Sequence, residues 1–324
     1  MKKFLSLFII LVMTAAIFTG CSTTTTAVTI KANWYSQVSQ ENIVSINEKV
    51  IYNIRYDDTD NSNTDMSISD FRGTYEMALN TDSENNLYIL KTKQTNISGK
   101  YVGADAEYDI SNDTIETETK FKSVKNNLKP VSSYKKYSAY SPLSDGTAVL
   151  YEYEYSTVYE GSNATVTLLS HSENYTNHKD TITYTKIDKS NLYFDNDQLL
   201  FAIRSLSLDK SFSATVSAIS PVDEKLQSIN IKVSDAEPFV TFNLKNLGVL
   251  ENGVLLTDDK TISAIKTTVV LNATMTGNSI ICYYAVNNSE YVNYRSRLIK
   301  METSLPYKLG GLVYTLNSVE YSES

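Results

Sequence analysis

The two cysteines are the residues of this sequence best suited to covalent chemistry, and they stand in different surroundings. Cys282 lies in the apolar run 280–284, where a thiol acts as a small hydrophobic side chain unless a base and an orienting group stand beside it. We therefore expect Cys282 to be buried in a strand. Cys21 follows small residues and precedes a polar, threonine-rich stretch, which makes it the better candidate for modification.

Residues 1–20 have the order of a secretory signal peptide: a basic start, an apolar run over 4–18, and small residues before Cys21. The apolar run is shorter than the about 20 residues that a membrane-spanning helix needs. The motif Phe18-Thr19-Gly20-Cys21 resembles the lipobox of bacterial lipoproteins, although that family usually has an aliphatic residue where Phe18 stands. The resemblance implies cleavage before Cys21 and attachment of acyl chains, such as palmitate, to its sulfur.

Acyl chains on Cys21 would anchor the protein to the membrane, because each buried methylene contributes about 0.8 kcal/mol. Residues 21–32 would then be the lipidated cysteine and a flexible tether, since 22–26 are polar, uncharged and low in complexity. We expect an extracytoplasmic protein held by lipid at the outer face of the cell membrane.

Metal sites are the next chemistry to consider. His171 and His178 share a polar loop with Glu173 and Asp180, but a zinc site needs three or four ligands at suitable spacing and no known motif is matched. The acidic stretch 57–65 lacks the glycine and glutamate of a calcium-binding EF-hand loop. We therefore expect no metal and no cofactor.

Two groups of residues are candidates for ligand binding. Tyr151, Tyr153 and Tyr155 would share one face of a strand over 149–159, where they could stack on sugars, hold an apolar ligand or pack in the core. Arg295 and Arg297 lie two positions apart and would share a strand face. They could clamp an anionic ligand, or they could be edge charges that discourage aggregation.

A basic stretch without any acidic residue runs over 120–136. Its lysines could face anionic headgroups or wall polymers, or they could belong to a solvated linker. They are Lys120, Lys122, Lys125, Lys129, Lys135 and Lys136.

These candidates would be positioned by strands, because apolar and polar residues alternate with a period of two through most of the chain. The predicted fold is all-β, a curved antiparallel sheet or a sandwich, built as one sheet or as two sheet units. One segment, 196–206, has apolar residues at helical spacing, and Asp195 or Asn196 is a plausible N-cap for it. It predicts a short helix lying against a sheet.

The chain beyond the tether divides into a β-rich N-terminal region, 33–190, and a β-rich C-terminal region with the short helix, 191–324. A stretch with two prolines, 122–146, is a further candidate boundary or long loop. The apolar motifs in 280–284, 296–302 and 311–314 resemble an uncharacterised family of bacterial envelope proteins, a likeness over about 190–321. The resemblance implies a curved antiparallel sheet and brings no catalytic residue with it.

Composition limits the possible functions. Residues 21–324 contain 27 basic and 37 acidic residues, a net charge of −10, which argues against nucleic-acid binding. The chain has no G-x-S-x-G elbow, no glycine-rich phosphate loop and no C-x-x-C pair. We therefore favour a non-enzymatic lipoprotein that binds an apolar or glycan ligand of the envelope, or supports a surface assembly. The alternatives are a carboxylate-based hydrolase of wall or extracellular polymer and a structural or adhesive surface protein.

Overall fold

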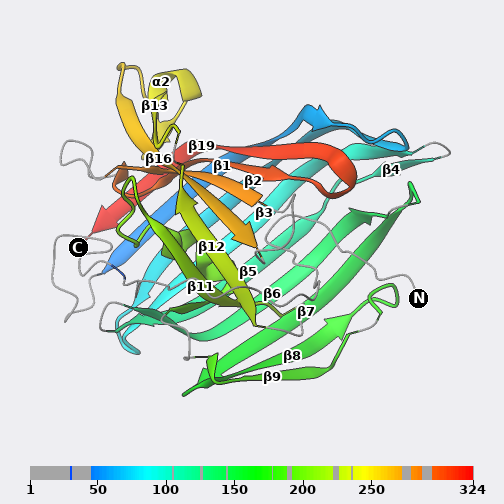
Figure 1. Ribbon diagram of the computed structural model, residues 1–324, viewed down its shortest axis with the longest axis horizontal. Helices are drawn as coiled ribbons and strands as arrows, with labels where there is room; N and C mark the ends of the chain where they lie inside the picture. The colour runs from blue at the N-terminus through cyan, green and yellow to red at the C-terminus, as the bar shows by residue number, and fades with distance from the viewer. Residues whose placement is uncertain are drawn as a thin grey trace.

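The computed structural model is one strongly curved, mainly antiparallel sheet, so the predicted all-β fold is confirmed (Figure 1). The structure describes residues 30, 45–103, 106–124, 127–143, 145–176, 178–187, 192–221, 226–234, 236–271, 279–286 and 294–323. Cys21, the signal peptide and nearly all of the tether lie outside these residues. In the part of the chain that the structure describes, no helix is long and apolar enough to span a membrane.

The first half of the sheet is a run of long antiparallel strands, paired in the order β1–β2–β3–β5–β6–β7–β8–β9, with β4 on β3. Their side chains alternate between the buried inner face and the solvated outer face, as the sequence period predicts. The strands are β1 (Ile46–Asn61), β2 (Met66–Asp82), β3 (Leu87–Gly103), β4 (Glu107–Asp109), β5 (Thr114–Ser123), β6 (Leu128–Pro142), β7 (Ala148–Glu160), β8 (Asn163–His171) and β9 (Thr181–Thr185).

The second half continues the sheet from the other side of β1, in the order β19–β18–β17–β16–β12–β11–β10. β13 also pairs with β16, whereas β10–β11 and β14–β19 are parallel pairs. The strands are β10 (Tyr193–Asp195), β11 (Ser213–Ile219), β12 (Gln227–Val233), β13 (Phe239–Asn243), β14 (Leu250–Glu251), β15 (Val254–Leu255), β16 (Thr261–Leu271), β17 (Ser279–Ala285), β18 (Leu298–Ser304) and β19 (Leu309–Glu323).

The sheet curls far enough for its two ends to meet. The hydroxyl of Tyr184 on β9 donates to the carbonyl oxygen of Ser220, just after β11, at 3.1 Å. The ring of Tyr193 on β10 stacks on Tyr159 of β7, with ring centroids 6.5 Å apart. In Figure 1 the green strands β11 and β12 accordingly lie across the concave side of the sheet. The result is a barrel-like body with a distinct interior.

The interior is filled by side chains and by a short helical segment, as predicted for 196–206. A 3-10 turn, η2 (Asn196–Gln198), leads into α1 (Leu199–Ile203), and every residue of both is buried. Asp195 caps the turn, because its Oδ1 accepts a hydrogen bond from the backbone N–H of Asp197 at 3.0 Å. Short helical pieces that the sequence did not predict are α2 (Leu244–Leu247) and η4 (Pro306–Lys308).

The stretch 122–146 is not a boundary or a long loop, because most of it is the central strand β6. Both prolines occupy positions that a strand tolerates. Pro130 lies next to a register shift in the pairing with β5, and Pro142 is the last residue of the strand. The division of the chain into 33–190 and 191–324 stays a prediction.

Candidate functional site

The three tyrosines proposed for ligand binding lie on the inner face of β7 and are covered. Tyr151, Tyr153 and Tyr155 are 3%, 1% and 2% exposed. Tyr153 stacks on Tyr137 of β6 with ring centroids 4.7 Å apart. Tyr175, in the loop between β8 and β9, packs on Tyr153 with centroids 4.5 Å apart. Other aromatic rings therefore fill the face that a ligand would need. Core packing, the alternative interpretation, accounts for this geometry, and a role in ligand binding stays a prediction.

Arg295 and Arg297 do not share a strand face, so that expectation was wrong. β18 begins only at Leu298, and the arginines lie in the preceding turn, where Ser296 has a φ of 51°. Arg295 is half-buried, whereas Arg297 is 2% exposed. Neither is the edge charge that the alternative interpretation describes.

Arg297 belongs to a buried cluster with Glu48 of β1 and Arg204 at the end of α1. Arg204 binds the Glu48 carboxylate in bidentate fashion, with Nη1–Oε1 at 2.7 Å and Nη2–Oε2 at 3.4 Å. Arg297 Nη2 donates to Glu48 Oε2 at 3.2 Å. No local pattern signals this cluster, because Arg204 and Arg297 lie 156 and 249 positions from Glu48 along the chain.

A second buried polar cluster fixes the helical segment to β6 and β7. Asp195 Oδ2 accepts hydrogen bonds from the hydroxyls of Ser133 and Tyr159, each at 2.6 Å. Lys135 Nζ donates to Asp197 Oδ1 at 3.0 Å. Burial, followed by the nearby Asp197 charge, raises the pKa of Asp195 to about 6. Both carboxylates are engaged inside the core, so this pair holds the segment in place.

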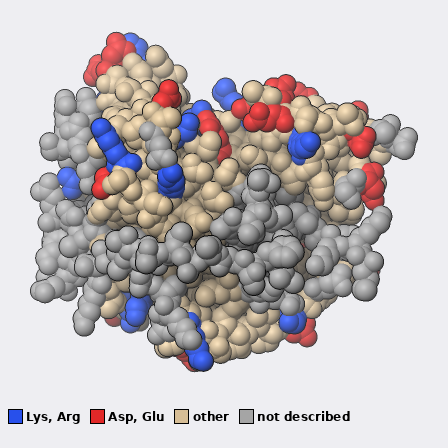
Figure 2. Space-filling model, viewed as in Figure 1, with Lys and Arg blue, Asp and Glu red and all other residues tan. Residues whose placement is uncertain are grey.

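Half of the lysines in the lysine-rich stretch lie beside acidic side chains. Lys135 is buried, Lys136 pairs with Glu154 at 3.0 Å, and Lys120 lies 3.5 Å from Glu118. Lys125 lies outside the described residues. On the described part of the face in Figure 2, basic and acidic side chains are interspersed. Strand alternation turns Lys135 inward, and acids on β5 and β7 lie beside Lys120 and Lys136. The exposed Lys122 and Lys129 are register partners on β5 and β6, so a basic surface at this pair stays a prediction.

Cys282 is fully buried in β17, as expected, and burial raises the pKa of its thiol to about 12. The rings of His171 and His178 lie 4.1 Å apart, and His178 Nδ1 is 3.8 Å from Asp180 Oδ1. Among the residues that the structure describes, no three His, Cys, Asp or Glu side chains gather so that they could hold a metal ion.

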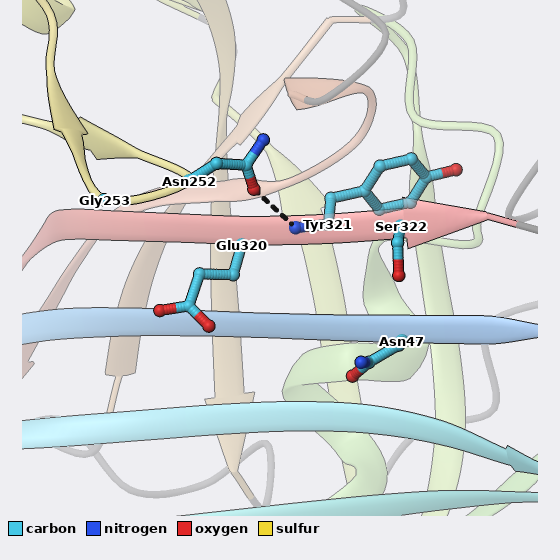
Figure 3. A pocket seen from close by; sticks show the side chains of 6 residues that line it. All are labelled: Asn47, Asn252, Gly253, Glu320, Tyr321 and Ser322. Carbon is cyan, nitrogen blue, oxygen red and sulfur yellow. Dashed lines mark hydrogen bonds between the residues drawn. The ribbon is translucent and has the colours of Figure 1, made fainter.

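An open polar hollow of about 380 Å³ lies where the start of β1, the end of β19 and the β14–β15 hairpin meet (Figure 3). Asn47 and Ser322 are register partners on β1 and β19. Figure 3 shows Glu320 and Ser322 pointing to the β1 side of β19, with Asn252 and the Tyr321 ring on its other side. The lining residues are Asn47, Asn252, Gly253, Glu320, Tyr321 and Ser322.

A tight turn builds the upper wall of the hollow. Asn252 and Gly253 both have positive φ, 48° and 81°, which is the pattern of a two-residue hairpin turn. Asn252 then docks on β19: its N–H donates to the carbonyl oxygen of Val319 at 2.8 Å, and its Oδ1 accepts from the N–H of Tyr321 at 3.1 Å. Sequence analysis missed this site, although Asn-Gly between apolar residues is the usual signal for such a hairpin.

The hollow offers carboxylate, amide and hydroxyl groups to solvent. Asn47, Asn252, Glu320 and Ser322 are all exposed. Together they provide hydrogen-bond donors and acceptors in one place, with a single carboxylate among the lining residues that the structure describes. Such a set can bind a neutral, hydroxyl-rich molecule.

Comparison with known proteins leaves the family open. No family model matches the sequence, and no curated protein matches it. Among solved structures, the chain is similar to a β-barrel-like protein with a domain of unknown function from Brucella abortus. The TM-score is 0.47 and the identity 9%, over 86% of this chain and 99% of that one. At this level of similarity the neighbour says nothing about ligand or activity, and the envelope-protein resemblance of 190–321 stays a prediction.

Proposed function

We propose that this protein is a lipid-anchored binding protein of the cell envelope, and that the hollow between β1, β19 and the β14–β15 turn holds a glycan. The hollow itself is the observation that carries this proposal. Sugars present many hydroxyls that both donate and accept hydrogen bonds, which is what exposed amide, hydroxyl and carboxylate side chains supply. Val254 and Leu255, which are 69% and 53% exposed, continue from the same turn and offer apolar contact for the ring carbons of a sugar.

The geometry favours binding over cleavage. A glycoside hydrolase acts through two carboxyl groups roughly 5 to 9.5 Å apart on opposite sides of the scissile bond. Glu320 is the one carboxylate among the described residues that line the hollow. The filled inner face near Tyr153 likewise favours a glycan at the rim over an apolar ligand inside the sheet.

The anchoring half of the proposal is supported by the lipobox-like sequence that ends at Cys21. Mass spectrometry of the mature protein from its native host should find an N-terminal cysteine that carries acyl chains. The Cys21→Ala variant should no longer fractionate with membranes. A mature N-terminus without lipid would remove the anchoring part and leave the glycan site to stand on its own test.

The glycan site is tested by calorimetric titration of the full-length mature protein in detergent with glycan fragments released from its own envelope. Loss of a hydrogen bond to the charged Glu320 should weaken binding at least about tenfold in Glu320→Ala, and the loss should be smaller in Asn47→Ala. Glu173→Ala, which removes an exposed acid outside the hollow, is the matched control and should bind normally. Equal binding by all three variants would exclude the hollow as the site.

A further inference from the structure

We propose that the interior of the sheet contains a binding site for a small monovalent anion at the Arg297 guanidinium. This site lies on the inner face beside Glu48 and is independent of the glycan proposal. The side chain of Arg297 is 97% buried. Among the residues that the structure describes, its Nε and Nη1 atoms have no hydrogen-bond partner, and Nη2 makes one ion-pair contact, with Glu48.

Unpaired donors of this kind are rare inside proteins, because each one has given up its bonds to water. Leaving a buried donor unsatisfied is destabilising, and more so when the group is charged. A buried N–H group without a protein partner is therefore usually satisfied by an ordered water or an ion. Arg297 presents three such N–H bonds, one on Nε and two on Nη1.

The sign of the charge favours an anion over water. The Glu48 carboxylate already binds Arg204 through both of its oxygens. Arg204 also lies over the ring of Phe201, 5.1 Å from its centroid, which further stabilises its charge. Arg297 shares one oxygen of that same carboxylate, Oε2, with Arg204: the two Nη2 atoms lie 3.2 Å and 3.4 Å from it. A buried cation that shares its counter-ion in this way attracts a second negative charge strongly, because the interior screens it weakly.

The size of the anion follows from the packing around the cluster. Tyr52 and Tyr294 are fully buried large side chains near Arg297, and the buried Tyr284 lies near Tyr52. The Tyr52 hydroxyl donates to the carbonyl oxygen of Leu298 at 2.9 Å, so it is already committed. Because these large buried rings leave little room at the guanidinium, we assign the site to a halide or a carboxylate of the size of acetate.

The experiment uses bromide as the probe, with gluconate, which is too large to enter, as the balancing anion at constant ionic strength. Thermal unfolding of the full-length protein should shift upward by roughly 4 °C as bromide replaces gluconate up to 300 mM. Crystals grown in bromide should show an anomalous peak within hydrogen-bonding distance of Arg297 Nε or Nη1. The Arg297→Met variant should lose the shift, while Arg72→Met, an exposed arginine on β2, should keep it.

Arg297→Met should also fold well in gluconate, because it leaves Glu48 and Arg204 as a balanced pair. An anomalous map of the wild-type protein without a peak at Arg297 would overturn the proposal, even if the variant failed to fold. A bromide shift of equal size in wild type and Arg297→Met would overturn it as well.

Discussion

Lys135 and Lys136 are neighbours on β6, and their ion pairs show how the two faces of the sheet differ. Both lysines lie 3.0 Å from a carboxylate oxygen. Lys135 faces inward to Asp197, and the two side chains are 3% and 2% exposed. Lys136 faces outward to Glu154, and those side chains are 52% and 28% exposed. The two ion pairs have the same length, but loss of one partner should destabilise the protein far more at the buried pair, because a charge left without a partner is costly only away from water.

The largest expected effect comes from removing one acid of each pair. Asp197→Ala leaves Lys135 as an unpaired buried charge and should lower the free energy of unfolding by about 3–5 kcal/mol. Glu154→Ala leaves Lys136 in solvent and should cost about 1 kcal/mol at most. Chemical denaturation of both variants measures their free energies of unfolding. Similar decreases in the two variants would contradict the claim that the inner and outer ion pairs differ in their effect on stability.

Tyr159 and Tyr153, two tyrosines on the inner face of β7, allow a second comparison, between a hydroxyl that is hydrogen-bonded and one that is not. The Tyr159 hydroxyl donates to Asp195 at 2.6 Å, whereas the buried Tyr153 hydroxyl has no hydrogen-bond partner in the described part of the chain. Tyr159→Phe should therefore cost about 1.5–3 kcal/mol, the range for hydrogen bonds to charged groups. Tyr153→Phe keeps the ring stacking and should change stability by less than about 0.5 kcal/mol. A reversed order of the two losses in equilibrium unfolding would show that hydrogen bonding does not set the energetics of this core.

The pH dependence of stability tests a third buried group. Asp113 is 3% exposed, and burial raises its pKa to about 8, although it accepts a hydrogen bond from the N–H of Tyr140 at 3.1 Å. Between its ordinary pKa and about 8, the folded protein holds a proton that the unfolded chain releases. Stability from this group is thus complete below about pH 4 and is lost as the pH rises to 8, at up to about 1.4 kcal/mol per pH unit.

The Asp113→Asn variant should remove that slope, because the amide keeps the acceptor oxygen and does not titrate. Asp195, with its pKa raised to about 6, adds a fall of the same sign between about pH 4 and 6, which the variant should retain. Unfolding free energies measured from pH 4 to 9 compare the two proteins. Parallel curves for wild type and variant would mean that Asp113 titrates normally.

The contrast between the faces also explains what the sequence could predict. In β5 one face is solvated, so buried and solvent-facing residues alternate, and the period of two is enough to predict the strand. In β10 and at the end of β11 both faces are buried, and alternation disappears. The helical segment stayed recognisable because Asp195 and the apolar spacing after it are local signals.

Long-range partners were beyond prediction. Nothing local to Glu48, Arg204 or Arg297 indicates that three distant segments bring them together. Lys135 was predicted to belong to a basic stretch with the neighbouring lysines, because only the folded structure brings Asp197 within 3.0 Å of it. The Asn252-Gly253 turn was predictable as a hairpin, but its docking on β19, which creates the hollow, was not. The docking requires an edge of β19 that β18 does not occupy. The β18–β19 pairing ends at Thr315, and β14 pairs with β19 from Ser318 onward.

The most direct test of the central claim is to map where the ligand touches the protein. Full-length mature protein would be photo-cross-linked to diazirine-bearing glycan fragments of its own envelope, and the modified peptides would be identified by mass spectrometry. The account predicts modification around Asn47, at Asn252–Gly253 and over Glu320–Ser322. Modification at Tyr151, Tyr153 and Tyr155 instead, with none at the hollow, would contradict it.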